Sequence, residues 1–369
     1  AQRHAEEQKW AEANPELAKR LTDYIESNLP EIDYSKIEFK ANMASRNASA
    51  TVLSVLAENI GNMIVSSADL ANSDKTDGFL KKTHAITAAD FGGRFLQAGV
   101  AELTMAAIMN GIALHGGVIG ACGTFFVFSD YIKPALRMSA LMELPVKYIF
   151  THDAFRVGED GPTHEPIEHE AQMRLMEMMN NLAGHQSTLV LRPADSAETA
   201  ESWKMAMNNT TSPTVLILSR QDLEDLPAES GDRRAEACGT EKGGYIIMPA
   251  ENPDVTLVGN GSEVSLLCHV ADKLKAEGIK ASVASVPSIG LFMRQDKTYI
   301  ESVLPKGGCR FGLTAGLPAT MYPLMRHASK WDVYGMERFG ASAPYKVLDE
   351  KFGFTVDNIL SQVKNLLAE

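Results

Sequence analysis

The sequence predicts an α/β protein with two doubly wound domains, each built on a mainly parallel sheet. Short, continuous apolar runs alternate with longer segments of helical period, a pattern typical of buried parallel strands joined by helices. A polar, glycine-rich stretch interrupts this series, and 369 residues are too many for one ordinary domain. We therefore expect a connecting helical segment (residues 1–36), a first domain (37–230), a linker (231–243) and a second domain (244–369).

Hydrophobic periodicity predicts the elements in order. Between about residues 4 and 28, apolar residues recur at intervals of three and four, which predicts a helix. The stripe consists of Trp10, Ala13, Leu17, Leu21 and Ile25. Apolar runs in the first domain predict strands within residues 62–67, 116–122, 146–151, 187–192 and 214–219. Those in the second domain predict strands within residues 254–260, 281–287, 309–315 and 331–336.

Composition narrows the classes of function. The 35 basic and 47 acidic residues give a net charge of -12, which repels nucleic acid, so an anionic substrate needs a local group of cations. Four scattered cysteines favour neither a zinc site nor disulfides, and we expect a reducing, cytoplasmic location. The charged start lacks the apolar run of a signal peptide, and no run is long enough to span a membrane. We therefore expect a soluble protein without a membrane partner.

Polar side chains follow three of the predicted strands. Asp69 comes just after residues 62–67, His152 directly after the strand that ends at Thr151, and Arg220 after the strand near 214–219. Ligands of open parallel sheets bind beyond the carboxyl ends of the strands, where such loops converge. These side chains are therefore candidate site residues.

Glu102 and an aromatic series form a second group of candidates. A glutamate in a first helical turn usually compensates the helix dipole at the surface. Soon afterwards Phe125, Phe128 and Tyr131 are spaced by three, which predicts an aromatic stripe along one side of a helix. Such a stripe is ordinarily part of a core, and the functional alternative is a stacking wall for a flat heteroaromatic ring.

The loop after the third predicted strand has roughly 17 residues, which is longer than most connections and favours a functional role. It contains His152, Asp160 and His164. His164, Glu168 and His169 also allow a metal site, but they lack the flanking residues of a known zinc signature, and we expect no metal ligand in this chain.

Further groups suit anion binding. Arg46, Ser73 and Arg220 are able to bind phosphate, although each alone is more often solvated or salt-bridged. Gly259 and Gly261 follow a predicted strand as in dinucleotide sites, but the third glycine is missing. We expect a helix start there, capped by Ser262.

Several stretches together resemble transketolase, over roughly the whole chain. They are SADLANS (67–73), GVAE (99–102), GTFFVFSDY (123–131), YIFTHDAFRVGEDGPTHEP (148–166), LILSRQDL (216–223) and FGASAPYKVLDEKFGFTVDNI (339–359). The resemblance implies the carboxyl-terminal part of that enzyme, with a pyrimidine-binding domain and a C-terminal domain. Deoxyxylulose phosphate synthase and the β subunits of 2-oxo acid dehydrogenases share the glutamate and part of the loop, but they match the terminal segment less well.

The resemblance implies transfer of a two-carbon ketol unit between sugar phosphates, with thiamine diphosphate and Mg²⁺ as cofactors. Glu102 is similar to the glutamate that hydrogen-bonds the pyrimidine N1' and promotes its imino form, which makes it catalytic. Asp69 resembles a residue that lines the cofactor. The aromatic pocket around the pyrimidine would consist of Phe125, Phe128 and Tyr131.

For the substrate, the resemblance implies a second set of roles. His164 is similar to the catalytic histidine near the reacting carbons, and Asp160 to the partner of the sugar C2 hydroxyl. The phosphate clamp would consist of Arg46, Ser73, His152 and Arg220. Three positions depart from the family pattern: Ala101 stands where an arginine is usual, and Asn72 and Asp74 alter the turn around Ser73.

The family's diphosphate and magnesium motif, Gly-Asp-Gly followed by Asn, has no match in the sequence. The resemblance therefore implies that the amino-terminal domain is missing and that the chain alone is inactive. It also implies a homodimer, with the missing amino-terminal domain or subunit as a further partner. We expect a truncated chain, and a naturally split subunit stays the alternative. A related thiamine-dependent subunit and a catalytically silent paralogue are the rival interpretations.

Overall fold

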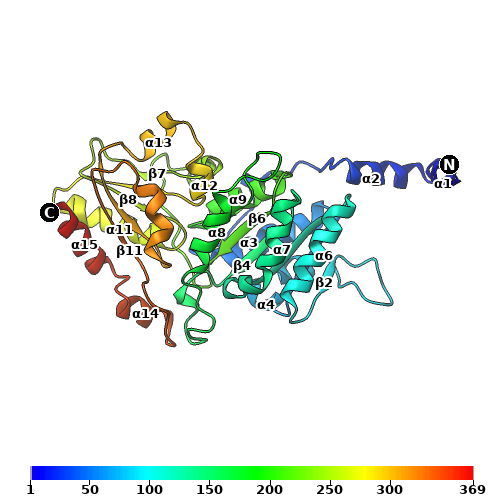
Figure 1. The fold of residues 1–369 in the computed structure, drawn as a ribbon, viewed down its shortest axis with the longest axis horizontal. Helices are drawn as coiled ribbons and strands as arrows, with labels where there is room; N and C mark the ends of the chain where they lie inside the picture. The colour runs from blue at the N-terminus through cyan, green and yellow to red at the C-terminus, as the bar shows by residue number, and fades with distance from the viewer. Residues whose placement is uncertain (1, 369) are drawn as a thin grey trace.

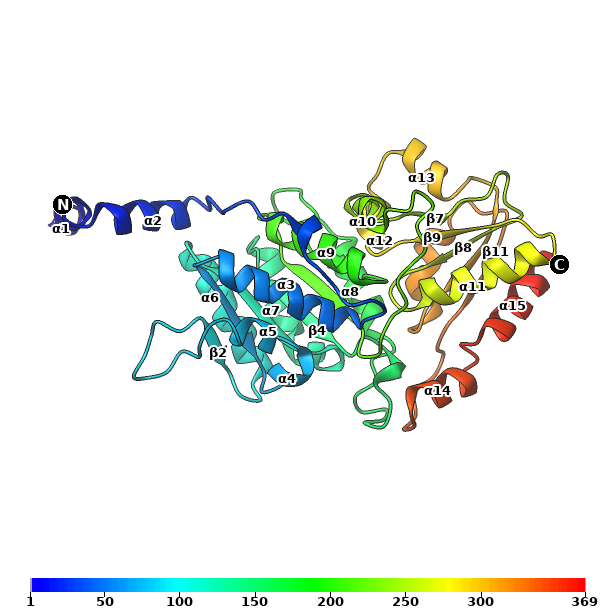
Figure 2. The same cartoon turned by 180° about the vertical axis from the view of Figure 1, so that it is seen from behind.

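A computed structural model describes residues 2–368, with two α/β domains arranged along its long axis (Figure 1). Helices α1 (Gln2–Ala13) and α2 (Pro15–Ile25) extend from the first domain on the side away from the second (Figure 2). The expected single helix is two helices because Pro15 has no amide hydrogen and suits the first turn of a new one. The predicted apolar stripe is exposed in this arrangement.

The first domain contains a six-stranded sheet with the order β2-β1-β3-β4-β6-β5, in which all neighbours are parallel. Its strands are β1 (Met63–Ser67), β2 (Phe95–Gln97), β3 (Ile119–Phe125), β4 (Lys147–Thr151), β5 (Leu189–Leu191) and β6 (Thr214–Leu218). Five were predicted, and β2 was not. The doubly wound parallel fold that we expected is confirmed for this domain.

Helices cover both faces of this sheet, so its central strands are buried on both sides. Ile149 packs beneath α3 (Ser45–Asn59) and α9 (Ser196–Asn208), whereas Tyr148 and Phe150 pack beneath α6 (Glu102–His115), α7 (Ser129–Leu141) and α8 (His169–Glu177). The helices are η1 (Tyr34–Lys36), α3 (Ser45–Asn59), α4 (Ala71–Asp74), α5 (Asp77–Leu80), α6 (Glu102–His115), η2 (Phe126–Phe128), α7 (Ser129–Leu141), η3 (Phe155–Val157), α8 (His169–Glu177) and α9 (Ser196–Asn208).

The second domain has a five-stranded sheet with the order β11-β10-β8-β9-β7, and only β7 is antiparallel to its neighbour. The strands are β7 (Tyr245–Met248), β8 (Val255–Gly259), β9 (Ala281–Ser285), β10 (Cys309–Leu313) and β11 (Lys330–Tyr334). The expected linker contains α10 (Arg233–Ala237) and η4 (Cys238–Lys242). The helices of the domain are α11 (Glu263–Ala276), α12 (Ile289–Phe292), α13 (Lys297–Val303), η5 (Pro318–Met325), α14 (Tyr345–Lys351) and α15 (Val356–Ala368). Two apolar clusters fill the two faces of the sheet. No helix within residues 2–368 combines the length and apolar character that crossing a membrane requires.

Buried charges join the two domains. The guanidinium group of Arg192, 1% exposed, donates to Asp153 of the first domain and to Asn260 of the second, and it pairs with Glu263. Arg156 donates to the other oxygen of Glu263 at 2.8 Å. This arginine network fixes the loop after β4 to the start of α11.

Candidate active site at the carboxyl ends of the strands

Four predicted phosphate-binding residues gather where β1, β4 and β6 end. Nη1 of Arg46, in the first turn of α3, donates to the backbone carbonyl of Ser73 at 2.7 Å and lies 3.2 Å from Nε2 of His152. Arg220 follows β6 and is near enough to affect the pKa of both Arg46 and His152. Ser73 thus contributes its carbonyl to this group, and its hydroxyl makes no hydrogen bond among the described residues.

The His152 ring is neutral. A guanidinium group only donates, so Nε2 beside Arg46 accepts, and Nδ1–H donates to Thr151 Oγ1 at 2.9 Å. Burial, followed by repulsion from Arg46 and Arg220, lowers the pKa of His152 to about 2. The positive charge of this site therefore comes from the arginines. His152 adopts a left-handed backbone conformation, with φ 64°, which turns the chain at the strand end.

Arg46 and Arg220 have no carboxylate partner within ion-pairing distance among residues 2–368. Burial lowers the pKa of Arg46 and the charge of Arg220 lowers it further, while the more distant Asp222 and Asp74 oppose this decrease. Two cations that repel each other without a paired anion form a site for an anionic ligand. Lys75 also affects the pKa of His152 and is a third nearby cation, which the sequence analysis missed although it follows the SADLANSD turn.

The acidic residue next to Ser73 faces inward. Asp74 is 1% exposed and accepts hydrogen bonds from Ser67 Oγ at 2.6 Å and from the amide and hydroxyl of Thr76. Burial raises the pKa of Asp74, and these hydrogen bonds oppose that rise. Its carboxyl thus stabilises the turn after β1, and both of its oxygens have protein donors.

The aromatic series is a connected row of rings, but it does not lie along one helix as predicted. Phe125 ends β3, Phe128 ends the short η2 turn, and Tyr131 lies in the first turn of α7. The rings of Phe125 and Phe128 are 6.0 Å apart and nearly parallel, and those of Phe128 and Tyr131 are 6.1 Å apart. The prediction of a helical stripe is wrong because the apolar run of β3 continues to Phe125 and a turn follows it.

Glu102 is the first residue of α6 and is only 8% exposed. Its carboxyl makes no hydrogen bond and no ion pair within the described chain. This low exposure of the residue contradicts the solvated surface position that a glutamate in a first helical turn usually takes.

The two loop candidates differ in their surroundings. The half-buried ring of His164 has its centroid 5.5 Å from that of Phe128 and 6.5 Å from that of Phe125, which also stacks on His152 at 3.6 Å. One phenylalanine thus connects the arginine group with His164. Asp160 and Asp69 are exposed, and neither contacts the other candidates in the part of the chain that the structure describes. Asp69 has φ 65°, which marks a sharp turn after β1.

The start of α11 differs from the sequence prediction. Ser262 precedes α11 but makes no side-chain cap, because its hydroxyl donates to Glu263 at 2.7 Å and accepts from Arg156. The prediction that Ser262 caps this helix is therefore wrong.

One group of possible metal ligands exists among the described residues: Asp130, Glu168 and His169. Lys133 Nζ lies 2.6 Å from Asp130, and His169 lies 3.3 Å from the other oxygen of the same carboxylate. Lys133 thus pairs with Asp130, whereas both ring nitrogens of His169 are buried without a hydrogen bond of ordinary geometry among the described residues. His164 is not a member of this group.

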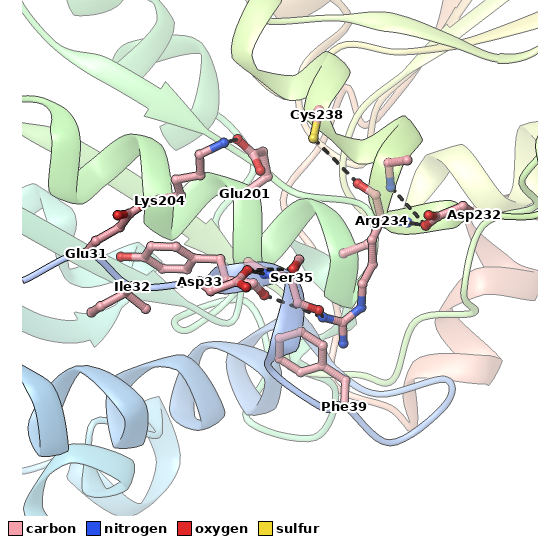
Figure 3. A pocket seen from close by; sticks show the side chains of 14 residues that line it. Glu31, Ile32, Asp33, Ser35, Phe39, Glu201, Lys204, Asp232, Arg234 and Cys238 are labelled. Atoms are coloured by element: carbon pink, nitrogen blue, oxygen red, sulfur yellow. Dashed lines mark hydrogen bonds and ion pairs between the residues drawn. The ribbon is translucent and has the colours of Figure 1, made fainter.

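A cavity of about 860 Å³ lies elsewhere, between the segment before α3 and helices α9 and α10 (Figure 3). Its basic groups already have partners: Lys204 pairs with Glu201, and Arg234 donates to the carbonyl of Ser35 (Figure 3). Lys204 also pairs with Glu241, and Arg234 with the carbonyl of Ile37. None of the predicted site residues lines this cavity.

The residues at the strand ends fit one half of thiamine diphosphate. A partnerless carboxyl at Glu102 and a row of aromatic rings suit an aminopyrimidine, which offers a flat face and ring nitrogens. Among the described residues, the one candidate group of metal ligands is Asp130, Glu168 and His169, and Asp130 already pairs with Lys133.

Comparison with known proteins agrees with this assignment to the pyrimidine half of the site. The family described as "Transketolase, pyrimidine binding domain" matches residues 41–225, and "Transketolase-like TK C-terminal domain" matches residues 243–355. Transketolases of Geobacillus stearothermophilus and Bacillus subtilis are each 41% identical to the chain over 365 residues. The two matches cover 98% and 97% of this chain, respectively, but only 52% of each relative. The chain therefore spans about half the length of these curated relatives.

Solved structures give the same result. The transketolase from Leishmania mexicana superposes with a TM-score of 0.87 at 33% identity, over 98% of this chain and 51% of that one. A structure described as "Split gene transketolase, inactive beta4 tetramer" has a TM-score of 0.67 at 24% identity, which shows the fold alone, over 88% of this chain and 99% of that one. The chain therefore belongs to the transketolase family and contains its pyrimidine-binding and C-terminal domains.

Proposed function

We propose that this chain supplies the aminopyrimidine and sugar-phosphate half of a transketolase, which transfers a two-carbon ketol unit between sugar phosphates. The observation that carries the proposal is the pair of unpaired guanidinium groups, Arg46 and Arg220, beside neutral His152. A phosphate group would accept charge-assisted hydrogen bonds from both arginines and a hydrogen bond from the Ser73 hydroxyl. Asp160 would bind the C2 hydroxyl of the sugar.

On the cofactor side, bound thiamine diphosphate would supply the carbon nucleophile that carries the ketol unit. Glu102 would share a proton with the pyrimidine N1', and its low exposure and its lack of a partner among the described residues support this role. Asp69 would line the cofactor, and His164 would move protons at the reacting carbons. The pyrimidine would stack within the wall formed by Phe125, Phe128 and Tyr131.

The partner in this proposal is the family's amino-terminal domain, which would bind the diphosphate through Mg²⁺. We also propose a homodimer through α6 and α7, because Leu103, Leu114 and Met138 are exposed around an apolar groove of about 420 Å³ on these helices. The split-gene relative is described as an inactive tetramer of one subunit, which supports self-association of such half chains.

We place the pyrimidine-binding domain at 37–230, the linker at 231–243 and the C-terminal domain at 244–369. Four free cysteines support a cytoplasmic location.

Calorimetric titration with thiamine diphosphate and Mg²⁺, combined with a coupled transketolase assay, tests the proposal. The chain alone should bind the cofactor weakly and show no turnover, because stacking contributes only about 0.5 to 1.5 kcal/mol per aromatic contact beyond buried area. Adding the separately expressed amino-terminal domain from the same source should restore both. Micromolar binding and turnover by the chain alone would refute the division, and no activity after proven reassembly would refute the function.

A further inference from the structure

The loop that carries Asp160 and His164 begins on contacts to the second domain. The ring of Phe155 packs between Phe352 and Phe354, with centroid distances of 5.3 and 4.8 Å. Arg156 Nε donates to Asp349 Oδ1 at 2.6 Å, and its Nη1 reaches Glu263. The base of the loop is therefore fixed to α11 and α14.

The middle and the end of the loop also contact the second domain. Ser342 Oγ donates to the carbonyl of Glu159 at 2.6 Å. A Cβ atom on Gly161 would lie 3.3 Å from Cβ of Ser342, so the two backbones are close. Past the histidine, the amide of Leu317 donates to the carbonyl of Ile167 at 3.2 Å.

Glu165, directly after His164, makes the closest of these contacts. It is 2% exposed, and a Cβ atom on Gly340 would lie only 1.4 Å from its Oε2. Neither carboxyl oxygen has a hydrogen bond of ordinary geometry within residues 2–368. Burial raises the pKa of Glu165 to about 7, the amide of Ala341 opposes that rise, and no charged side chain of the described residues contributes.

The His164 side chain itself has few anchors. Nδ1 lies 2.9 Å from Oγ1 of the neighbouring Thr163, and the ring lies against Phe125 and Phe128 of the aromatic wall. The position of the ring therefore depends on the backbone on both sides of His164. Ser342 contacts Glu159 and Gly161 before the histidine, and Gly340 contacts Glu165 after it.

We propose that the segment Gly340–Ser342 of the second domain is a positioning element for the loop that carries Asp160 and His164, and that Glu165 couples the two. The consequence for catalysis rests on the proposed function, whereas the coupling itself does not. Because an ionised carboxylate at this place would be buried without a partner, the coupling is strongest when Glu165 is protonated. The second domain thus acts on the chemistry through the loop.

Hydrogen–deuterium exchange of the 369-residue chain tests this coupling without requiring turnover. Gly340→Ala places a methyl group where Oε2 of Glu165 lies and changes no charge. We expect exchange in peptides covering residues 158–166 to rise about tenfold, which corresponds to about 1.4 kcal/mol, while peptides from α11 stay protected. Gly308→Ala is the matched control in the same domain, because its Cβ would make a tight contact of 3.3 Å with the carbonyl oxygen of Pro305 but not the overlap that Gly340→Ala produces.

Variants of Glu165 separate coupling from general damage. Wild-type protection of the loop, corrected for intrinsic exchange, should fall between about pH 6 and about pH 8, whereas Glu165→Gln should stay protected at both. Glu165→Ala should lose protection at both, and it carries the test if Gly340→Ala does not fold. Unchanged loop exchange in a folded Gly340→Ala chain, or the wild-type pH dependence in Glu165→Gln, would overturn the proposal. A chain that shows the coupling but gives no ketol transfer after reassembly would refute only the proposed function.

Discussion

Replacing Arg192 by Met should weaken the contact between the two domains. The guanidinium group donates to Asp153 Oδ2 through Nη2 at 2.6 Å and to Asn260 Oδ1 at 2.7 Å, and it pairs with Glu263. Methionine keeps much of the apolar stem and removes the charge. Glu263 would still have Arg156, but Asp153, whose side chain is 2% exposed, would have no remaining hydrogen-bond partner in the described residues.

Breaking a buried ion pair from one side costs about 3 to 5 kcal/mol, because the remaining charge is left desolvated. Burial already raises the pKa of Asp153, and Arg192 is the main group that opposes this rise. Without Arg192 the carboxyl would take up a proton more readily, so the loss should be larger at about pH 8 than at about pH 5. Urea unfolding followed by circular dichroism measures the loss in the free energy of unfolding.

Two further variants make this measurement decisive. Lys273→Met removes an exposed pair with Asp357, at 2.8 Å, and should stay within about 1 kcal/mol of wild type. Adding Asp153→Asn to Arg192→Met should recover part of the loss, because it removes the stranded charge. If Arg192→Met alone also lies within about 1 kcal/mol of wild type, the network does not stabilise the interface as we reason.

The other predictions concern single groups. In the complete enzyme, Arg220→Ala should raise the KM for phosphorylated donors, since a charge-assisted hydrogen bond is worth about 1.5 to 3 kcal/mol. The KM for an unphosphorylated ketol donor should stay unchanged. An equal rise for both donors would mean that Arg220 has a structural role. Glu102→Gln should abolish nearly all turnover with an unchanged circular dichroism spectrum, and wild-type exchange of the cofactor C2 proton would contradict the assigned role. The folded-state pKa of Glu165 is raised from 4.5 to about 7, so wild type loses stability as pH rises through that window. Thermal unfolding of Glu165→Gln should therefore show a gain over wild type at about pH 8, of up to about 3 kcal/mol, and none at about pH 4; equal gains at both would contradict the titration.

The sequence predicted the sheets well where strands are buried on both faces. The run TVLILS forms β6 because helices cover both faces of the sheet there, so the strand is apolar on both sides. Strand β2 was missed because it has three residues, of which only Phe95 is buried. Strand β7 was missed because it is a short edge strand next to a glycine-rich segment.

The site was predictable to the extent that it follows from topology. His152 and Arg220 were found because they come after strands whose carboxyl ends meet at one edge of the sheet. The burial of Glu165 was not predictable, because it depends on Gly340, which is 175 positions away along the chain and belongs to the other domain. Local periodicity carries no information about such a contact.

The attachment of the aromatic rings divides the wall into a fixed and an adjustable part. Phe125 is the last residue of a central strand, paired with Thr151 of β4 and 7% exposed, whereas Tyr131 lies on a helix and is 62% exposed. Rotamer changes of an exposed side chain are fast and inexpensive, but moving Phe125 would require the sheet to deform. We therefore expect cofactor analogues enlarged toward Tyr131 to be accepted and those enlarged toward Phe125 to be rejected, so the wall selects its ligand by shape at one end only.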